Sequence, residues 1–536
     1  MKKVFALLLL LSFFSTPSLA KAPDKDIIIL YTNDVHCGVD ANLGYAGFAY
    51  CAEEARKQTP YVALVDDGDF AQGETIGAIS HGRYIIEIMN AVGYDITAPG
   101  NHEFDYGWGM FENFSRNLKC GFISCNLRDL RTGQLFFKPY KILTYGDVKV
   151  AFVGICTPES IVKSTPSTFK DDDGNFIVGF DVDETGETLI ASVQKAVDDA
   201  RAEGADYVIA VGHLGEYKGI TERWTAMNVA EKTKGIDAFI DGHSHEVTPE
   251  MHVTNAESKD VIITQSGTKL MYVGKLTINT EGKVKSELLG GFDERDERIA
   301  KIVESIKARY EDTLKQHLSF TSFDLIAMDS SGDWLVRNGE TNLCDIVTDA
   351  FLASARETKT MKADIALQNG GSIRTNIKSG EVTFGNTLSV LPFNDTMCIA
   401  EMIGQTILDE LEMGARLMPE NSGGFFHVSG MSYTIDTRIA TPVILDDMNM
   451  LTAISGDRRV KNAIVNGEPL DPEKKYKVAM SSYPLLERGD GHIFKGAKLI
   501  EKNYMTPNEA FAHYVRDFQR LPERYRKSQG RIIILK

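Results

Sequence analysis

The sequence predicts an α/β protein with two folded domains joined by a helix, and three observations support this prediction. The chain has 536 residues, which is too long for one ordinary core at roughly 150 residues per domain. Between residues 26 and 279, short runs rich in Val, Ile and Ala alternate with helical stretches, which is typical of a layered fold with strands buried on both faces. Residues 320–536 have their own strand patterns, Gly-rich turns and helix patterns, without a low-complexity tract.

The first twenty residues have the organisation of a secretory signal peptide. Lys2 and Lys3 precede an apolar run from residue 4 to residue 14, and small residues flank a cleavage position after Ala20. The apolar run is shorter than the ~20 residues that a membrane-spanning helix needs, and no Cys follows the cleavage position to carry a lipid. We therefore expect a periplasmic or secreted mature chain without a membrane anchor.

The composition and the charge exclude some classes of partner. Hydrophobic residues make up 43% and charged residues 25%, as in a soluble globular protein, and the formal net charge is -17. A chain this acidic repels nucleic-acid polymers and anionic membranes. Small anionic substrates remain compatible with the charge if metal cations supply a local positive field. The composition does not define the oligomeric state.

The cysteines do not form a disulfide framework. The chain has seven, an odd number without a CxxC pair, so at least one thiol stays unpaired within a monomer. Cys120 and Cys125 are the closest pair in sequence. They are either bridged or two small buried side chains.

Seven apolar runs in the first domain predict its strands, and nearly all of them end in Asp, Asn or His. The runs are IIILYTND, YVALVDDGD, DITAPGNHE, KVAFVGICT, DYVIAVGHL, DAFIDGHSH and VIITQSG. Open α/β sheets place their sites at the carboxyl ends of strands, so we expect these polar residues to converge.

The polar residues at the strand ends include the ligands that divalent metals prefer at hydrolytic sites, which are carboxylates, imidazoles and amide oxygens. They are Asp34, His36, Asp69, Asn101, His213, His243 and His245. Each one alone is typical of a turn or of a hydrogen-bonded histidine. Their shared position at strand ends indicates a metal centre.

Residues 293–318 predict the connection between the domains. Hydrophobic residues recur there at helical spacing with charged residues between them, at Ile299, Ile302, Val303, Ile306, Tyr310, Leu314 and Leu318. This pattern predicts a single amphipathic helix whose charged residues form a solvated face. We therefore divide the chain into a signal peptide (1–20), a first domain (21–292), a linker helix (293–319) and a second domain (320–536).

The segments TNDVH, DDGD, GNHEFD, GH and GHSH resemble the calcineurin-like metallophosphoesterases. Their order and spacing are similar to the branch that contains the 5'-nucleotidases and UDP-sugar hydrolases, and the resemblance covers almost the whole mature chain. It implies that residues 21–292 form a layered α/β/β/α metallophosphoesterase domain. It also implies that residues 320–536 form a separate α/β nucleotide-binding domain.

The resemblance implies two divalent metal ions, with Zn and Mn the expected identities. Asp34, His36 and His245 would hold one ion, Asn101, His213 and His243 would hold the other, and Asp69 would bridge them. Some relatives have Gln or Asn where this chain has His245. Two such cations polarise a phosphoryl oxygen and make hydroxide available near pH 7.

The resemblance also gives the residue next to Asn101 a different role. His102 would stabilise the transition state or protonate the leaving group, and Asp105 would orient its ring. A carboxylate beside an imidazole raises its basicity and fixes its tautomer.

Three segments of the second domain, VRNGE, QNGGSIR and VLPFND, together with the stretch SSYPLLERGDG, resemble the nucleotide-binding domain of the 5'-nucleotidases. The implied substrate residues are Arg337, Asn369, Gly371, Arg374, Phe393, Tyr483 and Asp490. The two arginines would bind phosphate, Phe393 and Tyr483 would sandwich the base, and Asp490 would lie near the ribose or base. The spacing from Tyr483 to GDG is one residue longer than in several relatives, and Arg488 stands where Gly is usual.

We therefore expect a secreted two-metal hydrolase that removes phosphate from nucleoside 5'-monophosphates by attack of metal-bound hydroxide, with the base held by the second domain. A second interpretation keeps the same centre for a UDP-sugar pyrophosphatase or a 2',3'-cyclic nucleotide phosphodiesterase. A nucleotide-binding or adhesion module with a decayed site predicts missing ligands, whereas every ligand position is filled. A thiosulfate-ester hydrolase of related fold is disfavoured by the base clamp and the NGGSIR loop. The resemblance further implies a hinge motion that closes the two domains.

Overall fold

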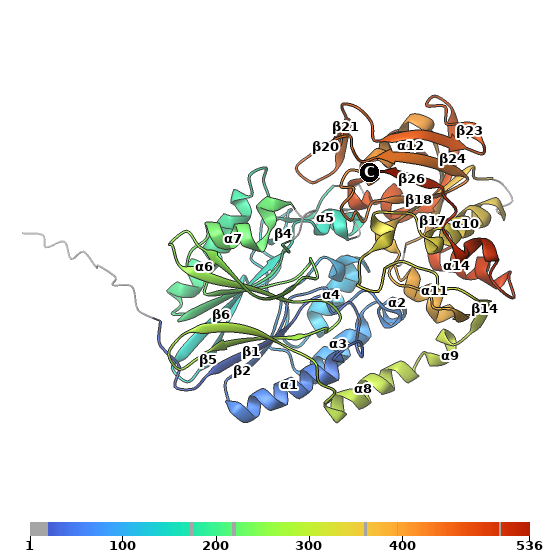
Figure 1. The fold of residues 1–536 in the computed structure, drawn as a ribbon. Helices are drawn as coiled ribbons and strands as arrows, with labels where there is room; N and C mark the ends of the chain where they lie inside the picture. The colour runs from blue at the N-terminus through green and yellow to red at the C-terminus, as the bar shows by residue number, and fades with distance from the viewer. Residues whose placement is uncertain are drawn as a thin grey trace, which may run out of the picture.

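The computed structural model describes residues 20–164, 166–171, 175–216, 221–357, 362–393, 395–502 and 505–536. Figure 1 shows an N-terminal unit, coloured blue to green, and a C-terminal unit, coloured yellow to red. The predicted signal peptide lies outside the described residues except for Ala20. Across the described ranges, no helix combines the length and apolar character that a membrane crossing requires.

The first sheet of the N-terminal unit has the strand order β13-β12-β1-β2-β3. Its strands are β1 (Ile27–Thr32), β2 (Val62–Asp66), β3 (Ile96–Thr97), β12 (Val273–Ile278) and β13 (Val284–Leu289). β1, β2 and β3 run parallel, so their carboxyl ends lie at one edge of the sheet.

The second sheet has the order β10-β11-β9-β8-β6-β5. Its strands are β5 (Tyr140–Tyr145), β6 (Val148–Cys156), β8 (Tyr207–His213), β9 (Ala238–Asp241), β10 (Val247–Thr254) and β11 (Asp260–Ser266). The four central strands are parallel, and the two edge strands are antiparallel to their neighbours. Each of the seven predicted apolar runs contains a strand of one of these sheets, which confirms the prediction.

The two sheets pack face to face and helices cover their outer faces. The core between the sheets includes Ile29 and Val65 from one sheet and Phe152 and Ile209 from the other. Helices α1 (Gly44–Gln58), α3 (Arg83–Val92), α4 (Trp108–Asn117) and α8 (Glu297–Ala308) cover the first sheet, and α6 (Glu187–Ala202) and α7 (Ala226–Lys232) cover the second. The predicted α/β/β/α layering is thus confirmed.

Short elements complete the N-terminal unit. They are α2 (Thr75–Ser80), α5 (Ser160–Lys163), the 3-10 helices η1 (His102–Phe104), η2 (Pro166–Phe169) and η3 (Glu222–Trp224), and the paired strands β4 (Leu127–Asp129) and β7 (Val178–Phe180). η1 follows β3 and α5 follows β6, so both begin close to the carboxyl ends of strands.

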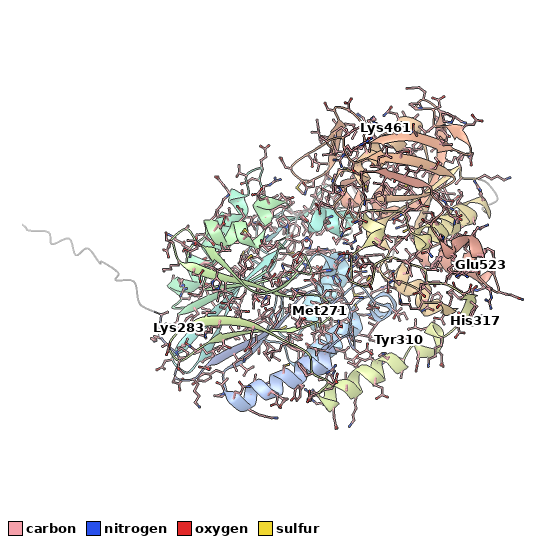
Figure 2. The ribbon with its side chains drawn as sticks, in the orientation of Figure 1. Met271, Lys283, Tyr310, His317, Lys461 and Glu523 are labelled. Atoms are coloured by element: carbon pink, nitrogen blue, oxygen red, sulfur yellow. The ribbon has the colours of Figure 1, made fainter. Side chains whose placement is uncertain are left out.

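The connection between the units differs from the single helix predicted over residues 293–318. α8 begins at Glu297, because the Asp296 side chain caps the helix by accepting a hydrogen bond from the backbone N–H of Ile299. It ends at Ala308, and a short helix, α9 (Glu311–Leu314), follows. Figure 2 labels Tyr310, which lies at this break.

The last residues of the predicted helix form a strand instead. β14 (His317–Thr321) pairs with β16 (Gly380–Thr383), and Figure 2 labels His317 at its start. Leu318 is buried in the core of the C-terminal unit, so tertiary packing overrides its helical spacing. The prediction of one continuous helix was therefore wrong, whereas the limits of the domains stay a prediction.

Besides the β14–β16 pair, the described part of the C-terminal unit contains two larger sheets and a projecting hairpin. The first sheet, β18-β15-β24-β17-β25, consists of β15 (Ile365–Asn369), β17 (Met397–Ile403), β18 (Phe426–Ser429), β24 (Lys475–Ser481) and β25 (Lys498–Lys502). The second, β23-β22-β19-β26, consists of β19 (Met431–Asp436), β22 (Val460–Val465), β23 (Glu468–Pro469) and β26 (Ile532–Leu535). The hairpin is formed by β20 (Val443–Leu445) and β21 (Leu451–Ile454).

Helices pack on both faces of the first of these sheets. α10 (Asn342–Glu357), α11 (Phe384–Val390) and α14 (Pro507–Arg516) share one core with it, and α12 (Gly404–Gly414) shares the other core together with the second sheet. Short elements carry the loops: α13 (Ser482–Leu485), η4 (Leu335–Arg337), η5 (Gly370–Ser372), η6 (Gly489–Gly491) and η7 (Glu523–Arg526). The prediction of a separate α/β C-terminal domain is confirmed.

Cys120 and Cys125 do not form a disulfide bond. Cys125 is buried and Cys120 is partly buried, so the pair takes the second of the two predicted forms, two small side chains without a bridge.

Candidate metal centre

The predicted ligands lie where the strands of both sheets end. Asp34 and His36 follow β1, Asp69 follows β2, Asn101 follows β3, His213 ends β8, and His243 and His245 follow β9. Five of them, namely Asp34, His36, Asp69, His243 and His245, have φ values between 45° and 70°. Residues other than glycine rarely adopt this left-handed backbone, and such strain persists where the surrounding structure fixes it for function.

The side chains converge on two neighbouring positions. Two triplets have ligand atoms within 4.8 Å of one another, Asp34 with His36 and His245, and Asp69 with His213 and His243. Asp69 lies between the triplets, because its Oδ2 is 3.1 Å from Nε2 of His213 and 3.8 Å from Nε2 of His36. This position suits the bridging role predicted for Asp69.

Hydrogen bonds to backbone carbonyls set which nitrogen of two histidine rings faces the centre. Nδ1 of His213 donates to the carbonyl oxygen of Asp67 at 2.6 Å, and Nδ1 of His36 donates to that of Gln72 at 3.0 Å. Each Nε2 therefore keeps its lone pair for a ligand. Nε2 of His36 and Nε2 of His245 lie 2.9 Å apart, so the two nitrogens can share a hydrogen bond or face one cation.

Two buried atoms of the predicted ligands have no assigned hydrogen-bond partner within the described part of the chain. They are Oδ1 of Asn101 and Nε2 of His213, the second of which lies 3.1 Å from Oδ2 of Asp69. Burying an unpaired polar atom is costly, and a metal ion removes that cost. Carboxylate, amide and imidazole donors fit Zn or Mn equally. The residues present therefore fit two divalent cations.

The titratable side chains at the centre shift the pKa values of one another. Burial alone opposes the charge of Asp69, but His213 and His102 beside it hold its pKa well below the ordinary value. Burial, together with the neighbouring His245, lowers the pKa of His36 well below its ordinary value, so this ring stays neutral and can act as a ligand.

His102 and Asp105 form a hydrogen-bonded pair next to the ligands. Nδ1 of His102 lies 2.5 Å from Oδ2 of Asp105. The His102 ring also belongs to a third group of potential ligands, with His36 and Asp69. Burial lowers the pKa of His102, but Asp105 and Asp69 outweigh burial and raise it above the ordinary value. The role predicted for His102 therefore stays a prediction, with the expected partner in place.

The sequence analysis missed two buried glutamates that organise the centre. Glu103 accepts hydrogen bonds from the backbone N–H groups of Asp69 and Gly100 through Oε2 and from that of Phe70 through Oε1, so it fixes the loops after β2 and β3. Glu159 lies 3.2 Å from Nε2 of His243. Glu103 adjoins a predicted ligand motif and could have been found from it, but no local pattern indicates Glu159.

The two arginines predicted to bind phosphate lie side by side in the C-terminal unit. The guanidinium carbons of Arg337 and Arg374 are 4.6 Å and 5.6 Å from the centre of the Trp334 ring, which the sequence analysis also missed. Burial and the charge of Arg337 lower the pKa of Arg374 to about 10, so it remains charged at neutral pH. Two neighbouring cations on one aromatic ring suit an anionic group of a ligand.

The other substrate residues of the QNGGSIR and GDG loops meet each other. Nδ2 of Asn369 is 3.4 Å from Oδ2 of Asp490. The backbone N–H of Gly371 donates to the carbonyl of Gly423 at 2.8 Å, and a Cβ on Gly371 would lie 3.1 Å from the Gly423 Cα. Gly371 thus allows two loops to approach closely.

The two predicted clamp rings face the N-terminal unit. The centre of the Phe393 ring is 6.3 Å from that of His102. The Tyr483 ring lies against Gly489, where a Cβ would be 2.2 Å from the ring, and its hydroxyl donates to the carbonyl of Val162 at 3.1 Å. The sandwich of a base between the two rings stays a prediction.

One further contact joins the two units near the Tyr483 ring. Lys163, at the end of α5, places Nζ 3.2 Å from Oδ1 of Asp490, and the side chains are 24% and 4% exposed. The sequence analysis did not identify Lys163, because nothing in its surroundings distinguishes it from a surface lysine.

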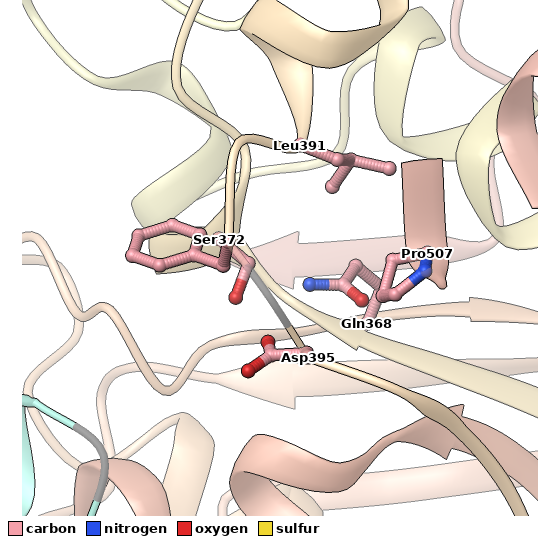
Figure 3. Close-up of a pocket in the computed structure, with 6 residues that line it drawn as sticks. Gln368, Ser372, Leu391, Asp395 and Pro507 are labelled. Carbon is pink, nitrogen blue, oxygen red and sulfur yellow. The ribbon is translucent and has the colours of Figure 1, made fainter. Parts of the chain in front are cut away.

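Phe393 also lines a narrow pocket, and Figure 3 shows the residues that line it. They are Gln368, Ser372, Leu391, Phe393, Asp395 and Pro507. Asp395 is buried, and burial together with Glu487 and Asp105 raises its pKa well above the ordinary value. The pocket that Phe393 lines therefore also contains a carboxyl group whose charged form burial disfavours.

Comparison with known proteins assigns both units to families. The family model described as calcineurin-like phosphoesterase matches residues 27–247, and the model described as 5'-nucleotidase, C-terminal domain, matches residues 327–498. These two ranges contain every predicted metal, catalytic and substrate residue.

Curated relatives agree with this assignment. The chain is 27% identical to the 5'-nucleotidase of Bos taurus over 519 residues, which cover 87% of this chain and 84% of that protein. It is 28% identical over 462 residues to the trifunctional nucleotide phosphoesterase protein YfkN of Bacillus subtilis, covering 78% of this chain. The match spans only 30% of the length of YfkN.

A solved structure extends the agreement to the fold. The 5'-nucleotidase precursor of Thermus thermophilus superposes with a TM-score of 0.79 and 25% identity, covering 95% of this chain and 99% of that chain. The sulfate thiohydrolase SoxB of the same species has a TM-score of 0.68 at 18% identity and shares the fold. With both family models matched in order, the chain belongs to the calcineurin-like phosphoesterases that carry a 5'-nucleotidase C-terminal domain, a family of metal-dependent phosphoester hydrolases.

Proposed function

We propose that this chain removes phosphate from nucleoside 5'-monophosphates, with the nucleoside bound by the C-terminal unit and the phosphoryl group bound at the metal centre. The observation that carries this proposal is the meeting of the two units: the Phe393 ring lies 6.3 Å from the His102 ring, and the guanidinium of Arg374 lies 5.8 Å from Phe393. An aromatic surface and a cation beside a metal centre suit a base and a phosphate on one substrate.

The metal assignments follow the two triplets. Asp34, His36 and His245 would hold one ion, Asn101, His213 and His243 the other, and Asp69 would contact both. Two divalent cations, when bound, polarise a phosphoryl group and lower the pKa of water. The net charge of -17 makes such a local positive field necessary for an anionic substrate.

The residues of the chain supply positioning and a proton. Arg337 and Arg374 neutralise and orient the phosphate. His102 keeps Nε2 for the substrate, because Nδ1 is hydrogen-bonded to Asp105. A proton on Nε2 can be donated to the leaving ribose oxygen, and the carboxylate of Asp105 stabilises the charged ring before transfer.

The contacts between the two units support an arrangement in which the units close over the proposed substrate site. Tyr483 and Asp490 bond to Val162 and Lys163 of the N-terminal unit. Closure excludes water, and opening of the same contacts would let products leave.

We further propose that the mature chain begins at Lys21 and is periplasmic or secreted, on the strength of the basic, apolar and small-residue regions of residues 1–20. Sequencing the N-terminus of protein recovered outside the cytoplasm tests this. A first residue other than Lys21, or retention in the cytoplasm, would contradict it.

Substrate comparison tests the activity. Purified chain is stripped with a chelator, reloaded with Mn²⁺ or Zn²⁺, and supplied with AMP, UDP-glucose or 2',3'-cyclic AMP. We expect the highest kcat/KM on AMP, with phosphate and adenosine as products, and no release without metal. Preferential cleavage of UDP-glucose or of the cyclic ester would replace the proposal with the corresponding anhydride or cyclic-ester hydrolase.

A further inference from the structure

Glu159 lies behind the metal centre and faces one predicted ligand. It is 2% exposed and stands directly before α5, three residues after the end of β6. Its Oε2 is 3.2 Å from Nε2 of His243. Its Oε1 accepts two hydrogen bonds from Thr221, one from the backbone N–H at 3.0 Å and one from the hydroxyl at 3.2 Å.

These contacts determine which nitrogen of His243 can bind a cation. A carboxylate only accepts hydrogen bonds when it is ionised, so Nε2 of His243 must carry the proton. Nδ1 then keeps its lone pair for a cation, and His243 belongs to the group formed with Asp69 and His213. Carboxylate–histidine–metal arrangements of this kind fix the ring and raise the basicity of the ligand nitrogen.

Thr221 connects Glu159 to the C-terminal unit. Nδ2 of Asn449 donates to the hydroxyl oxygen of Thr221 at 2.9 Å, and that hydroxyl in turn donates to Glu159. Asn449 belongs to the tip of the β20–β21 hairpin, residues 446–450. A chain of hydrogen bonds thus runs from the C-terminal unit to a predicted metal ligand.

The hairpin tip is docked on the N-terminal unit by more than this one bond. The carbonyl of Asp447 accepts a hydrogen bond from Arg223 at 3.3 Å, and Met450 is buried in a core cluster of the N-terminal unit. Asn449 also touches the substrate loop, since a Cβ on Gly491 would lie 2.1 Å from its carbonyl oxygen. The hairpin tip therefore contacts the support of the metal centre and the predicted nucleotide loop together.

We propose that Glu159 is a positioning residue that holds His243 for the metal ion it shares with Asn101 and His213, and that docking of Asn449 on Thr221 strengthens this support. The inference rests on the metal assignments of the proposed function. It adds that one of the two metal positions depends on contact with the C-terminal unit. The contact between the two units and the affinity for the metal ion are therefore linked.

The expected magnitudes separate the two steps. Loss of a residue that orients a metal ligand typically lowers metal affinity by about 10- to 100-fold. Loss of one neutral hydrogen bond, at about 0.5–1.5 kcal/mol, corresponds to roughly 2- to 10-fold. Glu159→Ala should therefore weaken one metal position by the larger factor, and Asn449→Ala should weaken the same position by the smaller one.

Glu159→Gln and Thr221→Val test the direction of the hydrogen bonds. A glutamine can accept from His243 with its oxygen, but its amide then faces the N–H and hydroxyl donors of Thr221. We expect an effect between those of the wild type and Glu159→Ala. Thr221→Val keeps the backbone donor and the side-chain shape but removes the hydroxyl, and with it both the bond to Glu159 and the link to Asn449. It should therefore weaken the metal position at least as much as Asn449→Ala, and adding Asn449→Ala to it should give no further loss.

The experiment is a calorimetric titration of the metal-free full chain with Mn²⁺, with Co²⁺ absorption spectra as a second readout of coordination. Glu381→Gln is the matched control for a Glu–His pair, because Glu381 bonds to His317 at 2.8 Å on the surface. Asn466→Ala is the control for Asn449, because both asparagines have a left-handed backbone. Both controls should titrate as the wild type does.

The outcomes are decisive without any nucleotide. Selective weakening of one of two metal positions in Glu159→Ala, with an altered Co²⁺ spectrum, supports the positioning role. Unchanged titration, or equal weakening of both positions, overturns it, and if Glu159→Ala does not fold, Glu159→Gln decides in the same way with its smaller expected effect. Wild-type metal affinity in Asn449→Ala overturns the link to the C-terminal unit. A chain that shows the metal effects but does not hydrolyse AMP would refute the proposed function and leave this inference standing.

Discussion

Replacing Asp105 with Asn removes the charge beside His102 and keeps the size of the side chain. The Asp105 side chain is 4% exposed and its Oδ2 is 2.5 Å from Nδ1 of His102, so solvent does not replace the lost carboxylate. Asparagine can present either its oxygen or its amide to the ring, and the amide would favour the neutral tautomer whose Nδ1 lacks a proton. Without the carboxylate, the charged form of the His102 ring is less stable, so His102 would be protonated less often and would donate its proton less well.

The size of the effect follows from the proposed proton transfer. General acid catalysis contributes about 10²- to 10⁴-fold to rate, which corresponds to about 3–5 kcal/mol of transition-state stabilisation. We expect kcat of Asp105→Asn on AMP to fall within that range. Metal content and KM should change little, because Asp105 does not belong to the groups of potential ligands.

Steady-state kinetics with AMP and metal analysis of the purified variant test this prediction. Asp95→Asn is the control, since Asp95 also accepts a hydrogen bond, from the backbone N–H of Leu64 at 2.9 Å, but stands directly before β3, whereas Asp105 comes after it. A kcat within threefold of the wild type at full metal content would refute the acid role of the pair. Loss of metal in Asp105→Asn would instead place its effect on ion binding.

Three further perturbations have defined outcomes. Gly489→Ala places a Cβ 2.2 Å from the Tyr483 ring. We expect the KM for AMP to rise by roughly 5- to 150-fold, which corresponds to the ~1–3 kcal/mol of one stacked base, while hydrolysis of p-nitrophenyl phosphate is retained. An equal loss on both substrates would contradict the clamp. Phe393→Ala should give the same split between the substrates, and Phe393→Tyr should restore AMP binding. His427 is buried, which lowers its pKa to about 4, and its Nε2–H donates to the Val336 carbonyl. As the pH falls, His427 is therefore protonated first in the unfolded chain, near its ordinary pKa of ~6.5. Stability is therefore complete above ~pH 6.5 and is lost progressively down to pH 4; relative to His427→Gln, urea unfolding should show a loss of about 2 kcal/mol between pH 7.5 and 5, and an identical loss in both proteins would rule out His427 as the cause.

Local sequence was sufficient to predict the strands and to identify the candidate ligands at their ends. The β1 run IIILYT is buried at all six positions, so its apolar residues needed no distant information to be recognised. Asp34 and His36 come directly after that strand, and His243 and His245 come directly after β9. Polar residues must leave the buried part of a sheet, and parallel strands bring them to one edge.

Local sequence was not sufficient for the connector. Ile299, Val303 and Ile306 have helical spacing and are buried on α8, and Leu318 continues the same spacing. Pairing of β14 with β16 placed Leu318 in a strand and in the core of the other unit. The energy of that long-range packing exceeds a helix preference of tenths of a kcal/mol per residue.

The sequence by itself determined the two α/β units, the polar residues at the strand ends that form the candidate metal centre, and the loops that resemble a nucleotide site. Only the tertiary structure decided that Glu159 supports His243, that Trp334 lies under Arg337 and Arg374, and that Lys163 meets Asp490. Each strand of the sheets is a regular run of buried residues, so the position where a strand ends can be recognised in the sequence. Glu159 and His243 are 84 residues apart, and a contact of this kind depends on the paths of two loops, which no local spacing records.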